Sequence, residues 1–268
     1  MPHAEPGTFL ALRFVLAFAL LAAIAATVGA KWPDRRGATV AVIVGALVHG
    51  LHLGGVFWAV KHGMPTGVAA VIVGMQPLFT ALLAAVWLKE TITARHQAGL
   101  ALGILGVVLV LWPKLDVSGS GITFATIVAT VMACLAVTLG TVLQKTFAGA
   151  TDLRTGMALQ YVGALIPVSL LMLTETREIA WNGEVIFALA WLTLVLSIGA
   201  ILLLMWLIRE GSVARVSSLF FLVPAVAALM AWVLFGETLG PVQVAGMALS
   251  GLAVWLASTG PRPAPPPR

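Results

Sequence analysis

Charged residues are scarce in this sequence. Asp, Glu, Lys and Arg make up 9% of its 268 residues, whereas 60% are hydrophobic and the mean hydropathy is +1.06. A soluble domain of this length could not cover so much apolar surface with so few charges. In lipid, a single helix satisfies its own backbone hydrogen bonds. The composition therefore predicts an all-α polytopic membrane protein.

Cysteine and several well-known site patterns are also missing. The one cysteine, Cys134, lies inside an apolar run, which excludes a disulfide framework and gives no support to a cysteine metal site. The sequence contains no GxxxxGKS/T loop for a nucleotide, no HExxH pair and no paired aspartates for a prenyl diphosphate. We therefore expect no cofactor, no metal and no enzymatic activity.

Basic residues outnumber acidic ones by 15 to 10, and the formal charge is +5. They stand in short connections and form no basic run, so we expect no nucleic-acid partner. One set of alternate connections, together with the tail, carries 11 of the 15 basic residues: Lys31, Arg35, Arg36, Lys89, Arg95, Lys145, Arg154, Arg209, Arg215, Arg262 and Arg268. By the positive-inside rule this side is cytoplasmic, which places the C-terminus inside and the first residue outside.

Nine apolar runs of membrane-spanning length follow one another along the chain. A helix of about 20 residues crosses the roughly 30 Å hydrocarbon layer. The leader before the first run has no Lys or Arg, so we do not expect a cleavable signal peptide. We expect an integral protein of the bacterial inner membrane, with helices over residues 9–30, 38–60, 66–88, 96–112, 122–144, 155–173, 185–208, 216–235 and 241–258.

An internal repeat recurs at a spacing of 147 residues. Residues 74–90, GMQPLFTALLAAVWLKE, return as LVPAVAALMAWVLFGE at residues 222–237, so that Pro77 corresponds to Pro224 (224 − 77 = 147) and Glu90 to Glu237. The copies fall in the third and eighth spans. Five spans separate them, which makes the copies opposite in membrane direction, as in many secondary transporters. The sequence therefore predicts an inverted repeat.

The same register leaves residues 122–144 without a counterpart in the first half. We infer ten helices in the full pattern, of which nine are present and the first is missing through a misassigned start, a truncation or a real loss. The expected organisation is a first repeat without its first helix (residues 1–112), an outer connecting loop (113–121), a second repeat of five helices (122–259) and a disordered cytoplasmic tail (260–268).

This pattern resembles the EamA-type branch of the drug/metabolite transporter superfamily. The resemblance rests on FLALRF (residues 9–14), on MQPLFTALLAAVWLKETIT (75–93) followed by Gln97-Ala98-Gly99, and on VPAVAALMAWVLFGETLGPVQVAG (223–246). It implies a ten-helix inverted repeat of five plus five, with both termini cytoplasmic and a central cavity for small metabolites. The chain differs from that pattern in lacking the first helix.

The predicted spans contain no Asp, Glu or Lys, so their few other polar side chains are the candidate site residues. His49 and His52 are three residues apart and share one helix face. They line the substrate cavity, or they are neutral side chains bonded to neighbouring helices. A metal pair is disfavoured because no third or fourth ligand is evident.

The third and eighth spans are each interrupted by a proline. A proline removes one backbone donor and frees the carbonyl four residues earlier. We interpret Pro77 and Pro224 as helix kinks that shape the cavity and act as hinges, with Gln76 touching substrate. Static packing kinks, with Gln76 bonded to the loosened backbone, are the alternative.

Threonines recur at steps of four in the fifth span, at residues 126, 130 and 138, with Cys134 between them. Thr130 and Thr138 are candidates for cavity lining. The alternative is that these hydroxyl groups bond carbonyls of their own helix and pack against neighbouring helices.

A further pair of polar side chains occupies repeat-related places. Gln160 and Tyr161 correspond to Arg13 and Phe14 at the spacing of 147, and they are candidate substrate contacts. Arg13 is a candidate cavity residue as well. Alternatively, its side chain extends outward to a lipid headgroup.

We interpret the chain as a secondary transporter or facilitator that moves a small metabolite, an amino acid or a related compound, by alternating access, with efflux as the favoured direction. Facilitation and proton antiport both stay open. A membrane structural or assembly partner that carries nothing is the alternative. A lipid-modifying enzyme ranks last because no nucleophile–base or metal set is present. The expected partners are the substrate and the lipid bilayer, and a homodimer is left open.

Overall fold

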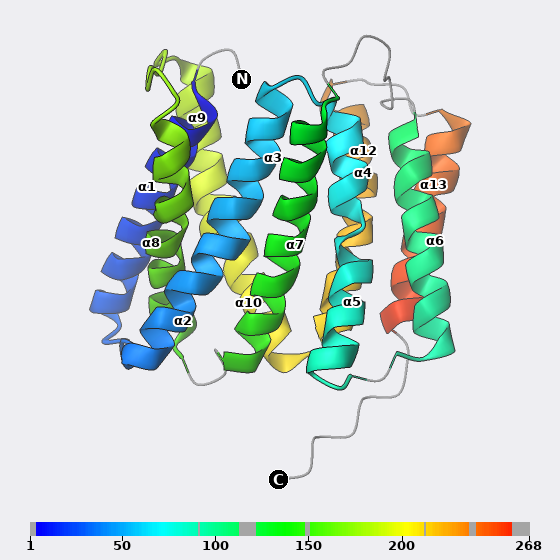
Figure 1. Cartoon of the computed structure of the whole chain (residues 1–268), viewed down its shortest axis with the longest axis horizontal. Helices are drawn as coiled ribbons and strands as arrows, with labels where there is room; N and C mark the ends of the chain where they lie inside the picture. Colours follow the sequence, from blue (N-terminus) through cyan, green and yellow to red (C-terminus); the bar gives the residue numbers. More distant parts are fainter. Residues whose placement is uncertain are drawn as a thin grey trace. The chain divides into compact units, whose positions relative to one another are not determined.

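The computed structural model describes residues 4–90, 92–112, 122–147, 151–211, 213–235 and 240–258, and helices account for most of them (Figure 1). Among these residues there is no β-strand, and only an isolated bridge joins Ala4 to Ile179. The all-helical prediction is confirmed. The elements are α1 (Pro6–Thr27), α2 (Arg35–Gly45), the π-helix η1 (Ala46–Leu51), α3 (His52–Lys61), α4 (Thr66–Gly74), α5 (Gln76–Trp87), α6 (Ala94–Leu111), α7 (Phe124–Phe147), α8 (Leu153–Met172), α9 (Gly183–Trp191), the π-helix η3 (Leu192–Ala200), α10 (Ile201–Glu210), α11 (Val213–Ser218), the 3₁₀ turn η4 (Leu219–Phe221), α12 (Leu222–Phe235) and α13 (Pro241–Ser258).

Seven helices or continuous helix series in the described residues are long and apolar enough to cross a membrane. They are α1, α2–η1–α3, α4–α5, α6, α7, α8 and α9–η3–α10. Residues 215–230 and 241–257 form shorter apolar helices. Each predicted run thus coincides with a helix, although nine crossings stay a prediction. The first helix begins at Pro6, three residues before the predicted start, because a proline fits the first helical turn without losing a hydrogen bond.

The two predicted proline interruptions are breaks between helices rather than bends within one. α4 ends at Gly74 and α5 begins at Gln76, so that Pro77 lies in the first turn of α5. A proline there removes an N–H group that has no helical partner in any case. Pro224 likewise lies near the start of α12, directly after η4. Both breaks therefore precede their prolines by a few residues.

The helices group into two compact units, and each unit takes elements from both halves of the chain. Unit 1 contains α1 to α3 and α7 to α10, whereas unit 2 contains α4 to α6 and α11 to α13. The predicted outer loop (113–121), the tail (260–268) and Glu237 lie outside the described residues.

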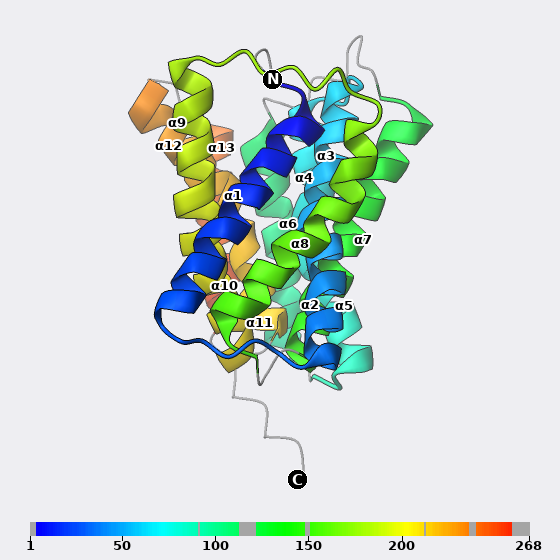
Figure 2. The same ribbon diagram turned by 90° about the vertical axis from the view of Figure 1, so that its left-hand side faces the viewer.

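In unit 1, α1 and α8 pack side by side in opposite directions (Figure 2). The Glu175 carboxylate, just beyond the end of α8, accepts hydrogen bonds from the backbone N–H groups of Gly7 and Thr8 at 2.8 and 2.9 Å. At the other end, the Thr155 hydroxyl donates to the Lys31 carbonyl at 3.0 Å. An acidic side chain at a helix N-terminus satisfies free donors and complements the helix dipole.

The close approach of α2 to α8 depends on two glycines. A Cβ atom built on Gly45 would lie 1.8 Å from the Gln160 carbonyl oxygen, and one on Gly163 would lie 1.9 Å from the Val42 carbonyl oxygen. No side chain of any size fits at such distances, so these contacts require glycine.

Two spans of unit 1 that are related by the spacing of 147 residues differ in the exposed fraction of their side chains. On α2 and η1, Val44 and Val48 are 0% and 6% exposed because they pack against Val137 of α7. The residues 147 positions later, Trp191 of α9 and Val195 of η3, are 46% and 43% exposed. These side chains of the first span are thus buried against protein, whereas the corresponding side chains of the second span are exposed.

In unit 2, α6 and α13 form a tight antiparallel pair. A Cβ atom on Gly99 would lie 2.9 Å from the Ala253 carbonyl oxygen, and one on Gly106 would lie 2.9 Å from that of Gly246. Gly99 and Gly246 are related by the spacing of 147 residues (246 − 99 = 147), and so are Gly106 and Ala253 (253 − 106 = 147). The contact of residue 99 with residue 253 is therefore repeated by the contact of residue 246 with residue 106.

A second pair of contacts between α6 and α13 has the same arrangement. The Gln243 side-chain amide donates to the Val110 carbonyl at 3.5 Å, and the His96 ring lies beside the Ala257 backbone. Gln243 and Ala257 lie 147 residues after His96 and Val110. Each helix thus places a polar side chain from its first turn on the last turn of its neighbour.

Candidate functional site

A buried polar cluster occupies the interior of unit 1. It consists of Arg13, His49, Gln144, Gln160, Tyr161 and Ser197, all less than a tenth exposed. These residues come from α1, η1, α7, α8 and η3. Four of them, Arg13, His49, Gln160 and Tyr161, are sequence-predicted site residues, and the structure brings them together.

Ser197 joins two members of the cluster through different atoms. Arg13 donates through Nε to the Ser197 hydroxyl at 2.8 Å, and the Tyr161 hydroxyl donates to the Ser197 carbonyl at 2.6 Å. That carbonyl belongs to a π-helix, in which the regular i to i−4 bonding is interrupted. The widened turn of η3 thus presents both a hydroxyl and a carbonyl to α1 and α8.

Three rings stack beside this contact. The Tyr161 ring lies 4.9 Å from His49 and 5.5 Å from Phe14, measured between centroids, with interplanar angles of 26° and 30°. The Arg13 guanidinium carbon lies 5.9 Å from the Phe14 ring centroid, within cation–π range. The rings fix the orientation of the imidazole and give it an apolar surround on the Tyr161 side.

Two polar atoms of the cluster have no hydrogen-bond partner of normal geometry among the described residues. They are Nε2 of His49 and Oε1 of Gln160. The Gln160 side chain lies beside His49, and its amide group donates to Oε1 of Gln144 at 2.8 Å. Because native proteins rarely leave buried polar atoms unpaired, we expect these two neighbouring atoms to pair with each other, with water or with a ligand.

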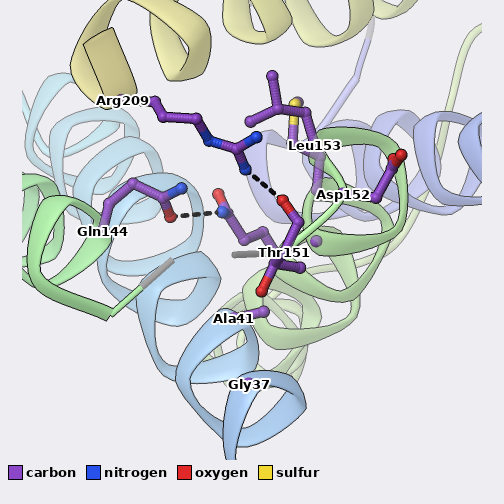
Figure 3. Close-up of a pocket in the computed structure, with 10 residues that line it drawn as sticks. Gly37, Ala41, Gln144, Thr151, Asp152, Leu153 and Arg209 are labelled. Carbon is purple, nitrogen blue, oxygen red and sulfur yellow. Dashed lines mark hydrogen bonds between the residues drawn. The ribbon is translucent and has the colours of Figure 1, made fainter. Parts of the chain in front are cut away.

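A small pocket reaches the Gln160 end of the cluster (Figure 3). Its lining includes Gln144, Gln160, Thr151, Asp152 and Arg209, and its cavity of about 10 Å³ is about the size needed for one water molecule. Arg209 of α10 extends across it and donates to the Thr151 carbonyl. The pocket thus lies between Thr151 and Asp152, just before α8, and the Gln144–Gln160 pair of the cluster.

The buried polar cluster contains the positive charge of Arg13 and no acidic side chain. Arg13 is 5% exposed, and among the described residues it forms no ion pair with an acidic side chain. Desolvating a charge without a counter-ion is expensive, so this arrangement is unusual for a purely structural arginine. The alternative prediction that Arg13 extends outward to a lipid headgroup does not fit, because the side chain is buried between helices.

The remaining polar candidates of unit 1 make local or backbone contacts. Nδ1 of His52 lies 3.1 Å from the Ala133 carbonyl oxygen of α7. Thr130 and Thr138 each donate at 2.8 Å to the carbonyl four residues earlier in their own helix. These contacts match the structural alternative for the three residues, and a role in substrate binding stays a prediction.

The other predicted site residues, Gln76, Pro77 and Pro224, belong to unit 2. Gln76 is 3% exposed, and its Nε2 has no described hydrogen-bond partner. Pro77 and Pro224 follow the two helix breaks. Glu90 accepts a hydrogen bond from the Val213 N–H at 3.1 Å and thereby caps α11.

Sequence reasoning missed Ser197 and Gln144. Ser197 lies in the run LTLVLSIGA, in which Thr193 is the other polar side chain, and Gln144 is the last residue of a predicted span. Both are nevertheless polar residues within predicted spans, which is the rule that selected His49 and Gln160. Applying it to every such residue would have included them.

An apolar groove of about 420 Å³ also lies in unit 1, between α3, α7 and α8. Its lining is aliphatic, small or aromatic, and includes Gly50, Gly54, Trp58, Ala133 and Pro167. Nothing in it can hydrogen-bond a polar solute through a side chain except the indole N–H group. The buried polar cluster is therefore the better candidate site.

The sequence matches the EamA-like transporter family over residues 1–112 and 123–259. It is 30% identical to a probable amino-acid metabolite efflux pump of Salmonella typhimurium over 203 residues, which cover 72% of this chain and 67% of that protein. It is 27% identical to the uncharacterized inner membrane transporter YedA of Escherichia coli K12, over 93% of this chain and 80% of that one. A crystal structure with 19% identity has a similar fold, with a TM-score of 0.77 over 94% of this chain and 87% of the other.

Proposed function

Because the chain belongs to the EamA-like transporter family, we propose that it is a secondary transporter or facilitator that exports a small metabolite by alternating access. The proposed substrate is an amino acid or a related compound, in keeping with the name of the Salmonella relative. The proposed location is the inner membrane of a bacterium, in keeping with the name of the Escherichia coli relative, with the C-terminus in the cytoplasm.

The buried polar cluster is the observation that carries this proposal. Polar residues at bilayer depth are costly, and membrane proteins place them where a solute or an ion must pass. Here six such residues gather inside a unit whose outer surface is largely apolar. Arg13, His49, Gln160 and Tyr161 are the proposed substrate contacts, and Gln76 is a proposed contact from unit 2.

An inverted repeat is part of the proposal, and the paired contacts of α6 and α13 support it. A contact of the form 99–253 that recurs as 106–246 is what a two-fold axis between two copies would produce. The antiparallel packing of α1 and α8, which are also related by the spacing of 147, is of the same kind. Such repeats commonly carry a transporter's site at their interface.

We propose that the helices bend during transport at the points where four spans depart from regular α-helix. The π-helices η1 and η3 lie in repeat-related spans, and the breaks before Pro77 and Pro224 lie in another such pair. Interrupted helices have fewer backbone hydrogen bonds to disrupt when they bend. We assign hinge roles to Pro77 and Pro224. His52, Thr130 and Thr138 are assigned secondary positions along the path.

The test is flux through purified protein in liposomes. The liposomes are loaded with one radiolabelled amino acid at a time, and its release is compared with that from protein-free liposomes. We expect His49→Ala to lower the rate for a transported amino acid at unchanged folded yield. His62→Ala is the matched control, because His62 is exposed at the end of the same helix series. No release above the protein-free level for any amino acid would contradict the proposed substrate class.

A further inference from the structure

The apolar groove of unit 1 has a buried floor and an exposed rim. The floor contains Gly50 and Gly54, and residues of α7 and α8 form the walls. Leu51 and Met132 at the rim are 48% and 58% exposed, whereas Ala133 inside the groove is 2% exposed. In Figure 1 the helices α3 and α7, which contribute most of the lining, run side by side. A ligand can therefore enter the groove from the surface of the unit.

The dimensions of the groove fit one hydrocarbon chain. Its lining on the η1–α3 side runs from Leu47 to Trp58, which is about 16 Å along a helix axis at 1.5 Å per residue. Dividing the volume of about 420 Å³ by this length gives a cross-section of about 26 Å². A hydrocarbon chain, whose carbon atoms pack at 3.5–4.0 Å from their neighbours, occupies about 15–20 Å². A helix of 10–12 Å diameter occupies about 80–110 Å², so the groove fits a single chain and not a helix.

The position of the groove along its span matches one leaflet of a bilayer. Trp58 lies three residues before Lys61, the last residue of α3, and therefore near the end of the span. Leu47 lies about 16 Å further in, and one leaflet contributes about 15 Å of the roughly 30 Å hydrocarbon layer. Water is absent at this depth, and an empty groove would leave its lining without dispersion contacts. The hydrocarbon of the leaflet at the end of α3 is therefore the material that can fill the groove.

Polar and charged groups lie at the Trp58 end of the groove. Of the residues in the lining, Trp58 alone has a side-chain N–H group, and its indole stacks on the His62 ring with 4.0 Å between centroids. Lys61 is three residues after Trp58 on the same helix face, and its ammonium group forms an ion pair with Glu5. The side chains of this pair are 36% and 26% exposed. Such a pair complements a zwitterionic headgroup, because the ammonium group can donate to a phosphate while the carboxylate accepts from the headgroup amine.

We propose that the groove binds one acyl chain of a zwitterionic phospholipid such as phosphatidylethanolamine, with the headgroup at Trp58, Lys61 and Glu5. The chain lies along Gly50 and Gly54, and the phosphate accepts hydrogen bonds from the indole and ammonium groups. An acyl chain gains little free energy when it leaves other acyl chains, so the headgroup contacts provide the preference for this lipid. The groove shares no residue with the buried polar cluster, and the inference does not depend on the proposed transport function.

The test is photolabelling of the full chain in phosphatidylglycerol nanodiscs that contain a trace of phosphatidylethanolamine with a photoreactive acyl chain. Mass spectrometry locates the labelled residues, and the labelling of residues 47–58 and 129–139 is divided by that of residues 186–191, an exposed apolar segment. A phosphatidylglycerol probe with the same chains gives the reference ratio. We expect the phosphatidylethanolamine ratio to be about 5-fold higher, the factor that one net hydrogen bond contributes. Equal ratios for the two probes would overturn the proposal, and this comparison needs only the wild-type chain.

Variants test the chain and the headgroup separately. Gly54→Leu fills the groove floor, where the nearest atoms to an added Cβ are methyl groups at 3.9 Å, and we expect it to remove the excess labelling. Gly251→Leu is the matched control, because nothing lies within 4 Å of its added Cβ, and it should keep the excess. Glu5→Gln should leave the chain in the groove and remove the preference for phosphatidylethanolamine. Excess labelling that persists in Gly54→Leu would refute the chain site, and an unchanged preference in Glu5→Gln would refute the headgroup site.

Two other results would assign the groove to a different occupant. Met132→Cys places a thiol on the exposed rim, and Cys134 is buried, so disulfide-linked dimers of this variant would indicate a second copy of the chain at the groove. Loss of the excess labelling when a transported amino acid is added would indicate that the solute occupies the groove. Either result would overturn the lipid site.

Discussion

Replacing Gly45 by alanine is expected to force α2 and α8 apart. The added Cβ atom would lie 1.8 Å from the Gln160 carbonyl oxygen, whereas real Cβ contacts do not fall below 3.0 Å. The two backbones must therefore separate by at least 1.2 Å at this point (3.0 − 1.8 = 1.2). Neither contact atom belongs to a flexible side chain that could turn away. The cost of such overpacking is about 1–3 kcal/mol.

A glycine in the same helix series provides the control. At Gly54 the nearest atoms to an added Cβ are methyl groups of Leu171 and Val168, both at 3.9 Å, which is ordinary contact. Gly54→Ala should therefore be neutral or gain the helix preference of alanine, about 0.5–1 kcal/mol. The expected difference in free energy of unfolding between the two variants is about 1.5–4 kcal/mol.

The assay is unfolding by dodecyl sulfate in mixed micelles, followed by tryptophan fluorescence. Gly45→Ala should unfold at a lower denaturant fraction than the wild-type protein, and Gly54→Ala should not. Because the displaced backbone is that of Gln160, Gly45→Ala should also disturb the Gln144–Gln160 hydrogen bond and lower flux. Equal stability of the two variants would show that α2 and α8 do not approach as closely as described.

Three other outcomes are expected. Gly106→Ala should destabilise unit 2 by about 1–3 kcal/mol, because its Cβ would lie 2.6 Å from the Ser250 hydroxyl. Gly251→Ala is the control and should leave the stability unchanged, because nothing lies within 4 Å of its added Cβ. Equal unfolding midpoints of the two variants would contradict this packing. Glu175→Gln should weaken the cap of α1 by about 1–2 kcal/mol. Amide hydrogen exchange in the first turn of α1 should then become faster. Unchanged exchange in that turn would be evidence against the cap. Flux of a transported probe should not respond to an imposed pH gradient, because the predicted spans hold no carboxylate; a gradient-dependent rate would point to proton uptake by a histidine.

The helices were predictable because lipid leaves few alternatives to a spanning helix, and the inverted repeat stays a prediction. Periodic apolar runs predicted an element at residues 241–258, and α13 has these bounds. Arg13 and Gln160 were identified as candidates because polar residues in apolar runs are rare. The structure adds that Phe14 and Tyr161, one residue further on, are in contact.

The contacts that use backbone carbonyls were not predictable from the sequence. A carbonyl acceptor has no side-chain signature, so nothing in the sequence connects His52 with Ala133 or Tyr161 with Ser197. The π-helices η1 and η3 were missed for the same reason, since the apolar pattern changes little over one widened turn. The capping of α11 by Glu90 bridges 123 residues, and local capping rules cannot reach that far.

The different exposure of Val44 and Trp191 has a consequence for how easily the two repeat-related segments bend. Where α7 shields Val44, the π-helical region beside it can bend only if neighbouring side chains repack. Trp191 and Val195 are 46% and 43% exposed, so bending beside them requires less repacking of protein side chains. The segment around η3 is therefore expected to bend at a lower cost in side-chain packing than the segment around η1.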